Sequence, residues 1–297
     1  MTGEPPFRLD RQAVRRSFDR ASGQDTASMQ LQTRIGDELL ERLQYFRLEP
    51  RVIVDLGCGV GGAARQLRRR FPRARVIAID SGYLMARQAR RHQRFWRRFD
   101  CICADGRALP LAPHSVDLVF SNLMLQWCDD PGALFSQVQR TLRPGGLLLY
   151  STLGPETLSE LRSAWASADS ASHVSAFADM TQLAAAMSHS GLSEPVMDRE
   201  VQVSHYPDVQ ALMSELRTAG ARHAASDRRR SLTGRGRLQK MLGTYEEFRT
   251  GSGIPARWEI IYGAAFAGSL SPDLAAPANP GEYMVSANTV RLRGRTG

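Results

Sequence analysis

Hydrophobic positions follow two different periods along the chain. Between residues 51 and 150, four short apolar runs have the composition of buried strands: RVIVDLG, ARVIAID, DLVFSN and GLLLYST. Apolar residues at helical spacing lie between these runs and mark two buried faces: Ala63, Ala64, Leu67 and Phe71, then Leu134, Phe135, Val138 and Leu142. Strands that alternate with helices predict an α/β fold with a parallel sheet, in which ligands bind at the carboxyl ends of the strands.

Helical periodicity also dominates the segments on either side. Residues 11–47 repeat with a helical period and offer six positions for burial: Val14, Phe18, Ile35, Leu39, Leu40 and Leu43. The segment GPETLSELRSAWASA has an apolar stripe of Leu158, Leu161, Trp165 and Ala168. A second stripe, in PDVQALMSELRTAG, consists of Val209, Leu212, Met213 and Leu216. Asp208 is expected to cap this second helix and Gly220 to end it.

These patterns predict the domain organisation. We expect a helical cap over residues 1–48 and a core domain over 49–266. Two further strands are expected at 199–205 and 257–265, and helical lid insertions near 154–189 and 207–250. Residues 267–297 have the composition of a flexible tail.

A glycine-rich turn follows the first predicted strand. The sequence VDLGCGVGG places Gly57, Gly59 and Gly61 directly after Asp55 and ahead of a helix. Glycine is used where the backbone needs positive φ or where another group approaches closely, and a helix N-terminus favours anionic or nucleotide-like ligands. Asp80 ends the second strand, where an ionised carboxylate can accept from both ribose hydroxyls. Asp105 follows the third strand and could accept from an exocyclic amine.

Composition adds limited information. The chain has 297 residues, 42% of them hydrophobic, and a net charge of +9 in which Lys240 is the only lysine. Basic runs at 68–70, 90–98 and 227–240 fit solvated helix faces, nucleic acid or an acidic protein, and charge alone does not decide. No apolar segment is long enough to span a membrane. Four cysteines without a paired motif indicate a reduced, cytoplasmic protein with no metal site: Cys58, Cys101, Cys103 and Cys128.

Together these motifs resemble those of class I S-adenosylmethionine-dependent methyltransferases. The resemblance lies in VDLGCGVGG, Asp80, ADGRALPLAPHSVDLVFSN and LRPGGLLL. It implies a Rossmann-like fold with a seven-stranded, mostly parallel sheet and S-adenosylmethionine as the cofactor. It also implies that Gly57, Gly59 and Gly61 surround the amino-acid end of the cofactor. Asp80 would hold the ribose, Asp105 would contact the adenine, and Asp55 would anchor the methionine amine.

Further segments are similar to a narrower family, the malonyl-acyl-carrier-protein O-methyltransferases of biotin synthesis. They are SFDRAS, SNLMLQW, TLGPETLSELRSAW, ELRTAGARH and RRRSLTGRGRL. This resemblance implies methyl transfer to the free carboxylate of a malonyl thioester on acyl carrier protein or coenzyme A. It implies no nucleic-acid or membrane partner. The chain departs from the family at Asp25, where a tyrosine is usual, and at His223, where asparagine is common.

The chemistry of that substrate indicates which side chains to expect. A carboxylate with an ordinary pKa near 4 is already ionised at neutral pH, so it needs positioning rather than a general base. An arginine fork is the natural partner, and Arg20, Arg222 and the run 228–230 are candidates. Asn122, Gln126 and Trp127 follow the fourth strand, where acceptor and methyl donor would meet.

Two other functions fit the same sequence. One is methylation of a different small molecule, because a fold does not dictate its substrate. The other is a protein-modifying factor, since the segments LMSELRTAG and PARWEIIYG also resemble relatives that act in respiratory complex I assembly. Amine methylation of nucleic acid is disfavoured, because SNLM stands where such enzymes carry an N-P-P-Y-type tetrad.

Overall fold

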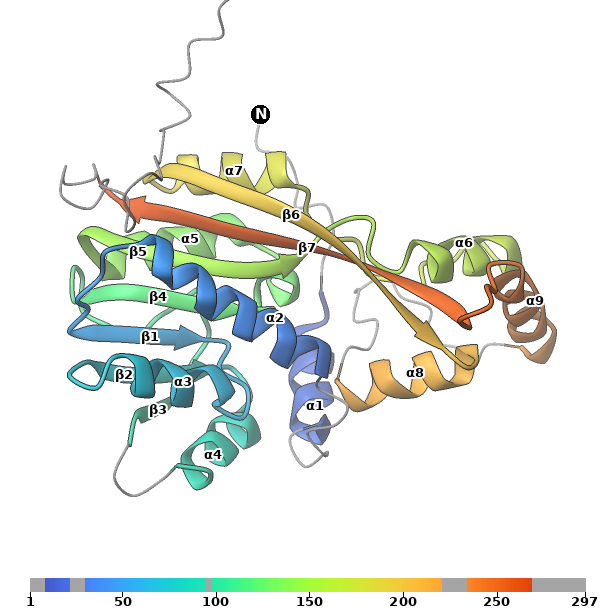
Figure 1. The fold of residues 1–297 in the computed structure, drawn as a ribbon, viewed down its shortest axis with the longest axis horizontal. Coiled ribbons are helices and arrows are strands. Elements are labelled where there is room, and N and C mark those ends of the chain that lie inside the picture. Colours follow the sequence, from blue (N-terminus) through green and yellow to red (C-terminus); the bar gives the residue numbers. More distant parts are fainter. Residues whose placement is uncertain (1–8, 22–29, 94–97, 221–233, 269–297) are drawn as a thin grey trace, which may run out of the picture.

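A seven-stranded sheet forms the centre of the computed structural model, which describes residues 9–21, 30–93, 98–220 and 234–268 (Figure 1). The strand order is β3-β2-β1-β4-β5-β7-β6. The strands β1 to β5 run parallel, whereas β7 is antiparallel to both β5 and β6. Their bounds are β1 Val52–Leu56, β2 Arg75–Asp80, β3 Asp100–Cys103, β4 Val116–Asn122, β5 Leu142–Leu153, β6 Leu192–Tyr206 and β7 Ile254–Ala267. The predicted α/β class and the mostly parallel sheet are confirmed.

Helices cover both faces of this sheet. The helices α2 and α3 lie on one face, and α5 and α7 lie on the other (Figure 1). The helix bounds are α1 Arg11–Ala21, α2 Gln30–Glu41, η2 Arg42–Tyr45, α3 Gly62–Arg70, α4 Tyr83–Arg91, η3 Leu125–Trp127, α5 Pro131–Thr141, α6 Ser159–Ala168, α7 Met180–His189, α8 Val209–Thr218 and α9 Arg235–Glu246. None of the helices in the described part of the chain combines the length and apolar character that crossing a bilayer demands.

The core consists of two apolar layers, one on each face of the sheet. Successive side chains of a strand point to opposite faces, so a strand covered on both sides is apolar throughout. On β1, Ile53 therefore joins the layer under α2 and α3, and Val54 joins the layer under α5 and α7. On β5, Leu149 likewise lies in the layer under α2 and α3, and Tyr150 lies in the layer under α5 and α7. This alternation explains why the first strands of the sequence carried an almost continuous apolar signal.

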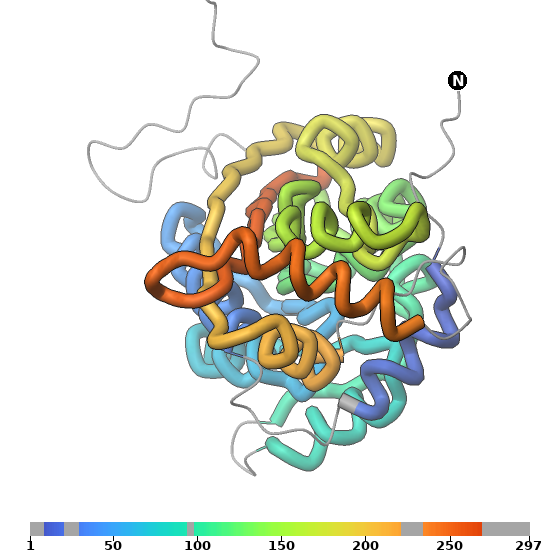
Figure 2. Tube along the Cα trace, turned by 90° about the vertical axis from the view of Figure 1, so that its right-hand side faces the viewer, coloured from blue at the N-terminus to red at the C-terminus, as the bar shows by residue number. Residues whose placement is uncertain are grey.

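The strands β6 and β7 extend beyond the rest of the sheet and carry three further helices. Figure 1 shows α6, α8 and α9 gathered around this projecting end, and Figure 2 views the same end face-on. Trp258 of β7 lies in the same apolar layer as Leu161 of α6, Leu212 of α8 and Met241 of α9. The expected insertion at 154–189 therefore divides into two parts. Its helix α6 joins the projecting end, while α7 covers the sheet beside α5.

Sequence patterns located the helix ends near α8 correctly. The Asp208 carboxylate accepts a hydrogen bond of 2.8 Å from the Ala211 amide, and Gly220 has a φ of +75° directly after the helix. The five candidates Val14, Ile35, Leu39, Leu40 and Leu43 are buried, and Phe18 is partly buried. The tail from residue 269 lies outside the described residues.

Both C-terminal strands are longer than the sequence predicts. The strand β6 starts at Leu192. A bulge between Ser193 and Val196 accommodates Pro195, so β6 pairs with β7 on both sides of the proline. Glu194 in this bulge has a φ of +52°. The strand β7 starts at Ile254, and Pro255 pairs opposite His205. Proline disrupts the apolar alternation from which strands are predicted, so both beginnings were missed.

Packing requires a glycine at one position of β7. Replacing this glycine with alanine should therefore destabilise the protein, whereas replacing an exposed glycine of α9 should stabilise it. A Cβ at Gly263 would lie 2.3 Å from the ring of Tyr150, which is 1% exposed. We expect Gly263→Ala to lower the free energy of unfolding by about 1–3 kcal/mol through overpacking. Gly243 of α9 is exposed and has no atom within 4 Å of its Cβ position, so Gly243→Ala should stabilise by about 0.5–1 kcal/mol. Urea unfolding measures both values, and equal midpoints for the two variants would contradict the packing argument.

Candidate active site

A turn of three glycines with positive φ follows β1. Gly57, Gly59 and Gly61 have φ values of +77°, +52° and +78°. The first and last of these are required by neighbouring protein atoms, because a Cβ on Gly57 would lie 2.3 Å from the Met124 side chain and one on Gly61 would lie 3.1 Å from Ala89. At Gly59 no atom lies within 4 Å of the Cβ position. The middle glycine therefore faces open space.

The Asp80 carboxylate fastens this turn to β2. One oxygen accepts from the Gly59 amide at 2.9 Å, and the other accepts from the Gly82 amide at 2.8 Å. Burial raises the pKa of Asp80, and the two backbone hydrogen bonds oppose that rise. Each oxygen keeps one further acceptor position, because a carboxylate has about four lone-pair sites.

Asp55 lies beneath the turn and is 1% exposed. Burial raises its pKa to about 7, since a charged carboxylate loses its hydration there, and a backbone hydrogen bond from Ala64 only partly offsets this. Its Oδ2 atom is buried and has no hydrogen-bond partner in the described structure. A buried carboxylate oxygen without a partner beside a pocket is suited to a cationic or strongly hydrogen-bonding ligand.

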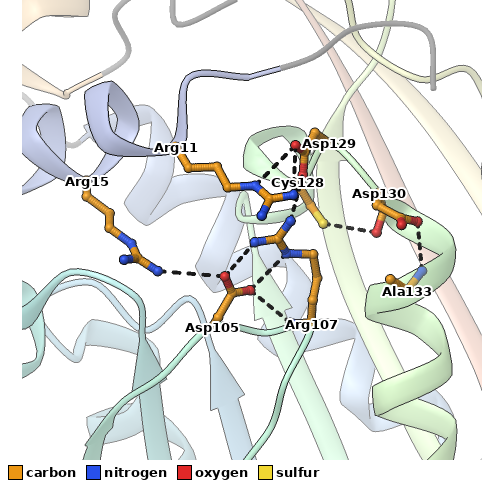
Figure 3. Close-up of polar contacts among 8 residues, drawn as sticks. All are labelled: Arg11, Arg15, Asp105, Arg107, Cys128, Asp129, Asp130 and Ala133. Atoms are coloured by element: carbon orange, nitrogen blue, oxygen red, sulfur yellow. Dashed lines mark hydrogen bonds and ion pairs between the residues drawn. The ribbon is translucent and has the colours of Figure 1, made fainter. Parts of the chain in front are cut away.

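Asp105 follows β3 and is held in a different way. Arg107 grips it with three donors: the backbone amide and Nε at 3.0 Å on Oδ1, and a terminal nitrogen at 2.6 Å on Oδ2. These bonds lower the pKa of Asp105 to about 2. Arg15 of α1 approaches Oδ2 to 3.7 Å (Figure 3). The side chain therefore stays ionised, and arginine nitrogens use most of its acceptor capacity.

These three aspartates and the glycine turn line one pocket of about 450 Å³. It opens where β1 and β4 lie side by side, which is the point at which the strand order reverses. α1 forms one wall through Arg11, Val14, Arg15 and Phe18. Gln32, Thr33 and Gly36 of α2 line another wall, and Thr218 and Ala219 at the end of α8 also reach the pocket. The site is therefore assembled from segments spread over most of the described chain.

The three residues predicted at the end of β4 have different surroundings. Asn122 lines the pocket, but its amide donates to the Gln32 carbonyl of α2 at 2.9 Å and accepts from Ser151 at 2.7 Å. Trp127 also lines the pocket, and its ring packs edge-on against Phe18 with centroids 5.1 Å apart.

Gln126 is oriented differently. It is buried and absent from the pocket lining, and it donates to the Leu123 carbonyl at 2.8 Å. Its carbonyl oxygen accepts from Thr152 at 3.3 Å. These contacts stabilise the turn after β4 from inside the protein.

Among the arginine candidates, only Arg20 lies in the described part of the chain. Arg20 lies on the exposed side of α1 and is not part of the pocket lining. Arg222 and the run 228–230 lie outside the described residues, as do Asp25 and His223. The described pocket instead contains arginines that sequence reasoning missed: Arg11, Arg15, Arg65, Arg69 and Arg107. Arg107 stands two residues after Asp105 in the ADGRALPL motif, which was a usable signal.

The remaining titratable groups do not form a second centre in the part of the chain that is described. No group of three or more His, Cys, Asp or Glu side chains there is arranged to hold a metal ion. All four cysteines are free thiols. Cys58 of the glycine turn is buried, which raises the pKa of its thiol.

Comparison with known proteins agrees with this geometry. Residues 54–150, from β1 to β5, match the family described as methyltransferase domain. The YcgJ protein of Bacillus subtilis aligns with a TM-score of 0.56 at 15% identity, over 79% of this chain and 98% of that one. The [4+2]-cyclase SpnF aligns with a TM-score of 0.50 at 17% identity, over 80% of this chain and 82% of that one. Likeness at such identities establishes the Rossmann-like fold only.

Sequence relatives are much closer. A malonyl-[acyl-carrier protein] O-methyltransferase of Xylella fastidiosa is 42% identical over 89% of this chain and 90% of its own length. Proteins of the same name from Methylovorus sp. and Halorhodospira halophila are 41% and 38% identical, over 88% and 97% of this chain. Identity at this level over nearly the whole length shows that the chain belongs to the malonyl-[acyl-carrier protein] O-methyltransferases, within the class I S-adenosylmethionine-dependent methyltransferases.

Proposed function

We propose that this protein transfers the methyl group of S-adenosylmethionine to the free carboxylate of a malonyl thioester, giving the methyl ester that enters biotin synthesis. The extent of identity to malonyl-[acyl-carrier protein] O-methyltransferases is the observation on which this conclusion depends. The pocket supports it, because its donors and acceptors are suited to the cofactor of that family.

Two features of the pocket test whether the cofactor fits. The buried Oδ2 of Asp55 lacks a partner, and the α-amino group of S-adenosylmethionine is a cation that could supply one. The space in front of Gly59 is free of protein atoms, and a side chain there would fill it. An unsatisfied acceptor in β1 and a bare backbone in the turn that follows suit an amino-acid moiety, so the residues present fit the cofactor.

We assign the remaining contacts by acceptor capacity. Asp80 would bind the two ribose hydroxyls with the lone pairs that Gly59 and Gly82 leave unused. Asp105 would accept from the exocyclic amine of adenine with the capacity that Arg107 leaves on Oδ2. At Gly57 and Gly61 the Cβ position is occupied by neighbouring protein atoms rather than by the ligand. We therefore assign these two glycines to the shape of the turn.

When bound, S-adenosylmethionine supplies a methyl group on a sulfonium centre, which a carboxylate oxygen can displace directly. The malonyl carboxylate is ionised at neutral pH, so the protein does not have to remove a proton. Consistent with this, no histidine is found among the described residues that line the pocket. Val14, Phe18 and Trp127 give that lining an apolar part, which excludes water and holds the acceptor in place.

We further propose acyl carrier protein as the carrier of the malonyl group. α9 carries Arg235, Arg237 and Lys240 on its exposed surface, at the projecting end where α6, α8 and α9 would form the lid (Figure 2). An acidic carrier protein would be attracted to such a surface, mainly through its association rate. Coenzyme A presents the same thioester without that protein surface.

The glycine turn gives a prediction about ligand binding. Gly59→Asn places a side chain in the open space, and asparagine tolerates positive φ, so the fold should remain. We expect the melting temperature to stay within a few degrees of the parent and binding of S-adenosylhomocysteine to fall below detection by calorimetry.

Gly57→Ala is the matched comparison. Its Cβ would collide with Met124, so here the melting temperature itself should fall. Normal ligand binding by Gly59→Asn would mean that the middle glycine serves only the turn.

Asp55 gives a prediction about pH. Its pKa is about 7 in the free protein, and a cationic amine favours the ionised carboxylate. Binding therefore releases a proton below pH 7, and the affinity for S-adenosylhomocysteine should weaken as the pH falls from 7 to 5.5, by at most about tenfold per pH unit. The amine itself stays protonated over this range.

The control is Asp55→Asn, which cannot titrate. It should bind more weakly at pH 7 and show a nearly flat profile between pH 5.5 and 7. Calorimetry in buffers of different ionisation enthalpy measures the proton release directly. The same slope in both proteins would assign the pH dependence to another group.

The proposed reaction is tested by methyl transfer itself. Purified protein with S-adenosylmethionine should add one methyl group, seen by mass spectrometry, to malonyl-[acyl-carrier protein] and not to acetyl-[acyl-carrier protein], which lacks the free carboxylate. If the basic residues of α9 attract the carrier protein, the preference for malonyl-[acyl-carrier protein] over malonyl-coenzyme A should shrink as the salt concentration rises. Salt screens exposed charges, with a Debye length of about 8 Å at physiological salt. Cofactor binding without transfer to either malonyl thioester would exclude this substrate class.

A further inference from the structure

The helix α1 closes the pocket with little apolar contact of its own. Leu9, Val14, Phe18 and Trp127 form a small apolar cluster that is separate from the two core layers. A helix usually gains most of its stability by packing an apolar face on the core. α1 therefore depends to an unusual degree on polar contacts for its position over the pocket.

Some of those contacts are single hydrogen bonds to neighbouring elements. Ser17 donates to the Gly220 carbonyl at 3.0 Å, and Asp19 accepts from the Leu84 amide of α4 at 3.1 Å. They hold the middle and end of α1 against α8 and α4. The first turns of α1 are instead held by ion pairs.

Five alternating charges connect α1 with the adenine side of the pocket: Arg15, Asp105, Arg107, Asp129 and Arg11 (Figure 3). We call this set the charge row. At one end Arg11 donates to both oxygens of Asp129 at 3.1–3.2 Å. In the middle Arg107 bridges the two carboxylates, with 2.6 Å to Asp105 and 3.0 Å to Asp129.

The members of the charge row differ in exposure. The side chains of Arg107 and Asp129 are 17% and 15% exposed, whereas those of Arg11 and Arg15 are 57% and 51% exposed. Arg107 and Asp129 are thus mostly buried beside the pocket, whereas Arg11 and Arg15 belong to α1. Cys128 and Asp130 secure the loop that carries Asp129: the Cys128 thiol donates to the Asp130 carbonyl at 3.2 Å, and Asp130 caps α5 at the Ala133 amide.

We propose that Arg107 is a positioning residue that couples the closure of α1 to the orientation of Asp105, so that the closed helix retains the bound cofactor. Arg107 fixes the Asp105 carboxylate with three donors and shares Asp129 with Arg11 of α1. A displaced α1 would leave Asp129 bound to Arg107 alone and remove Arg15 from Asp105. This inference rests on the proposed cofactor site.

The first test uses the protein without cofactor. Arg11→Gln should speed amide hydrogen exchange in residues 13–20 about three- to tenfold, because one end of α1 loses its charged partner. Arg16→Gln is the control on the same helix: Arg16 is exposed, and among the described residues its side chain donates a hydrogen bond only to Gln12, one turn away. In an Asp129→Ala background, Arg11→Gln should add no further increase, since the acceptor of Arg11 is already lost.

The second test measures ligand retention. Arg11→Gln should raise the dissociation rate of S-adenosylhomocysteine about three- to tenfold and leave its association rate within about twofold. High salt should raise the dissociation rate of the parent protein more than that of Arg11→Gln, because the outer pairs are half-exposed and therefore screened.

The third test separates positioning from general stability. The parent protein should prefer S-adenosylhomocysteine over S-inosylhomocysteine, which lacks the exocyclic amine, by roughly tenfold or more. Arg107→Gln should reduce that preference at least about threefold, and Arg107→Lys should restore part of it. Arg11→Gln keeps all three Arg107 donors on Asp105, so it should reduce the preference by less than Arg107→Gln does.

The outcomes separate the coupling from the cofactor assignment. Failure of the parent protein to bind S-adenosylhomocysteine would overturn the cofactor site, whereas the exchange measurement would still decide whether the charge row holds α1. Tight binding by the parent together with unchanged exchange and dissociation in Arg11→Gln would overturn the coupling. An unchanged ligand preference in Arg107→Gln, with its melting temperature intact, would overturn the positioning role.

Discussion

The Asp80 carboxylate is the contact on which the geometry of the site depends. It joins two loops that leave neighbouring strands, because one oxygen binds the Gly59 amide and the other binds the Gly82 amide. Two further hydrogen bonds, from the amides of Gly57 and Cys58 to the Ile79 carbonyl, tie the same turn to β2. The register between β1 and β2 therefore sets the position of the turn. These hydrogen bonds fix the turn relative to β2, so that its backbone stays exposed to the pocket.

Three aspartates of the pocket owe their different properties to their surroundings. Asp55 is buried with one unpartnered oxygen, which raises its pKa to about 7. Asp80 accepts two backbone hydrogen bonds that offset part of its burial. Asp105 is bound by Arg107, and its pKa is about 2. We therefore propose three roles for one residue type: Asp55 titrates and anchors a cation, Asp80 accepts from hydroxyls, and Asp105 stays ionised and accepts from an amine. This division suits a ligand with an amine, a ribose and a purine along its length.

Much of this could be predicted from local sequence, and the rest depends on contacts between distant segments. Strand and helix patterns predicted a mostly parallel sheet with helices between its strands, and the acids at the strand ends converge on one pocket as expected from parallel pairing. Gln126 has the same polar character as Asn122, yet only the structure shows that it points into the protein. Arg11 contacts Asp129 across 118 residues, which no periodicity reveals. Residues that bind through tertiary contacts are the ones that sequence patterns miss.

The reaction is not determined by the sheet, since SpnF shares the fold and is named as a cyclase. We propose that the choice of substrate depends on the segments that close the pocket. Here those segments are α1, α2 and the end of α8, and each is joined to the pocket by a polar contact: Arg11 to Asp129, Gln32 to Asn122, and Gly220 to Ser17 of α1. A carboxylate acceptor needs only desolvation and alignment, and walls held by polar contacts can open and close around such a substrate at modest cost in free energy. We therefore propose that α1, α2 and the helices of the projecting end select the substrate, while the sheet and its glycine turn hold the methyl donor.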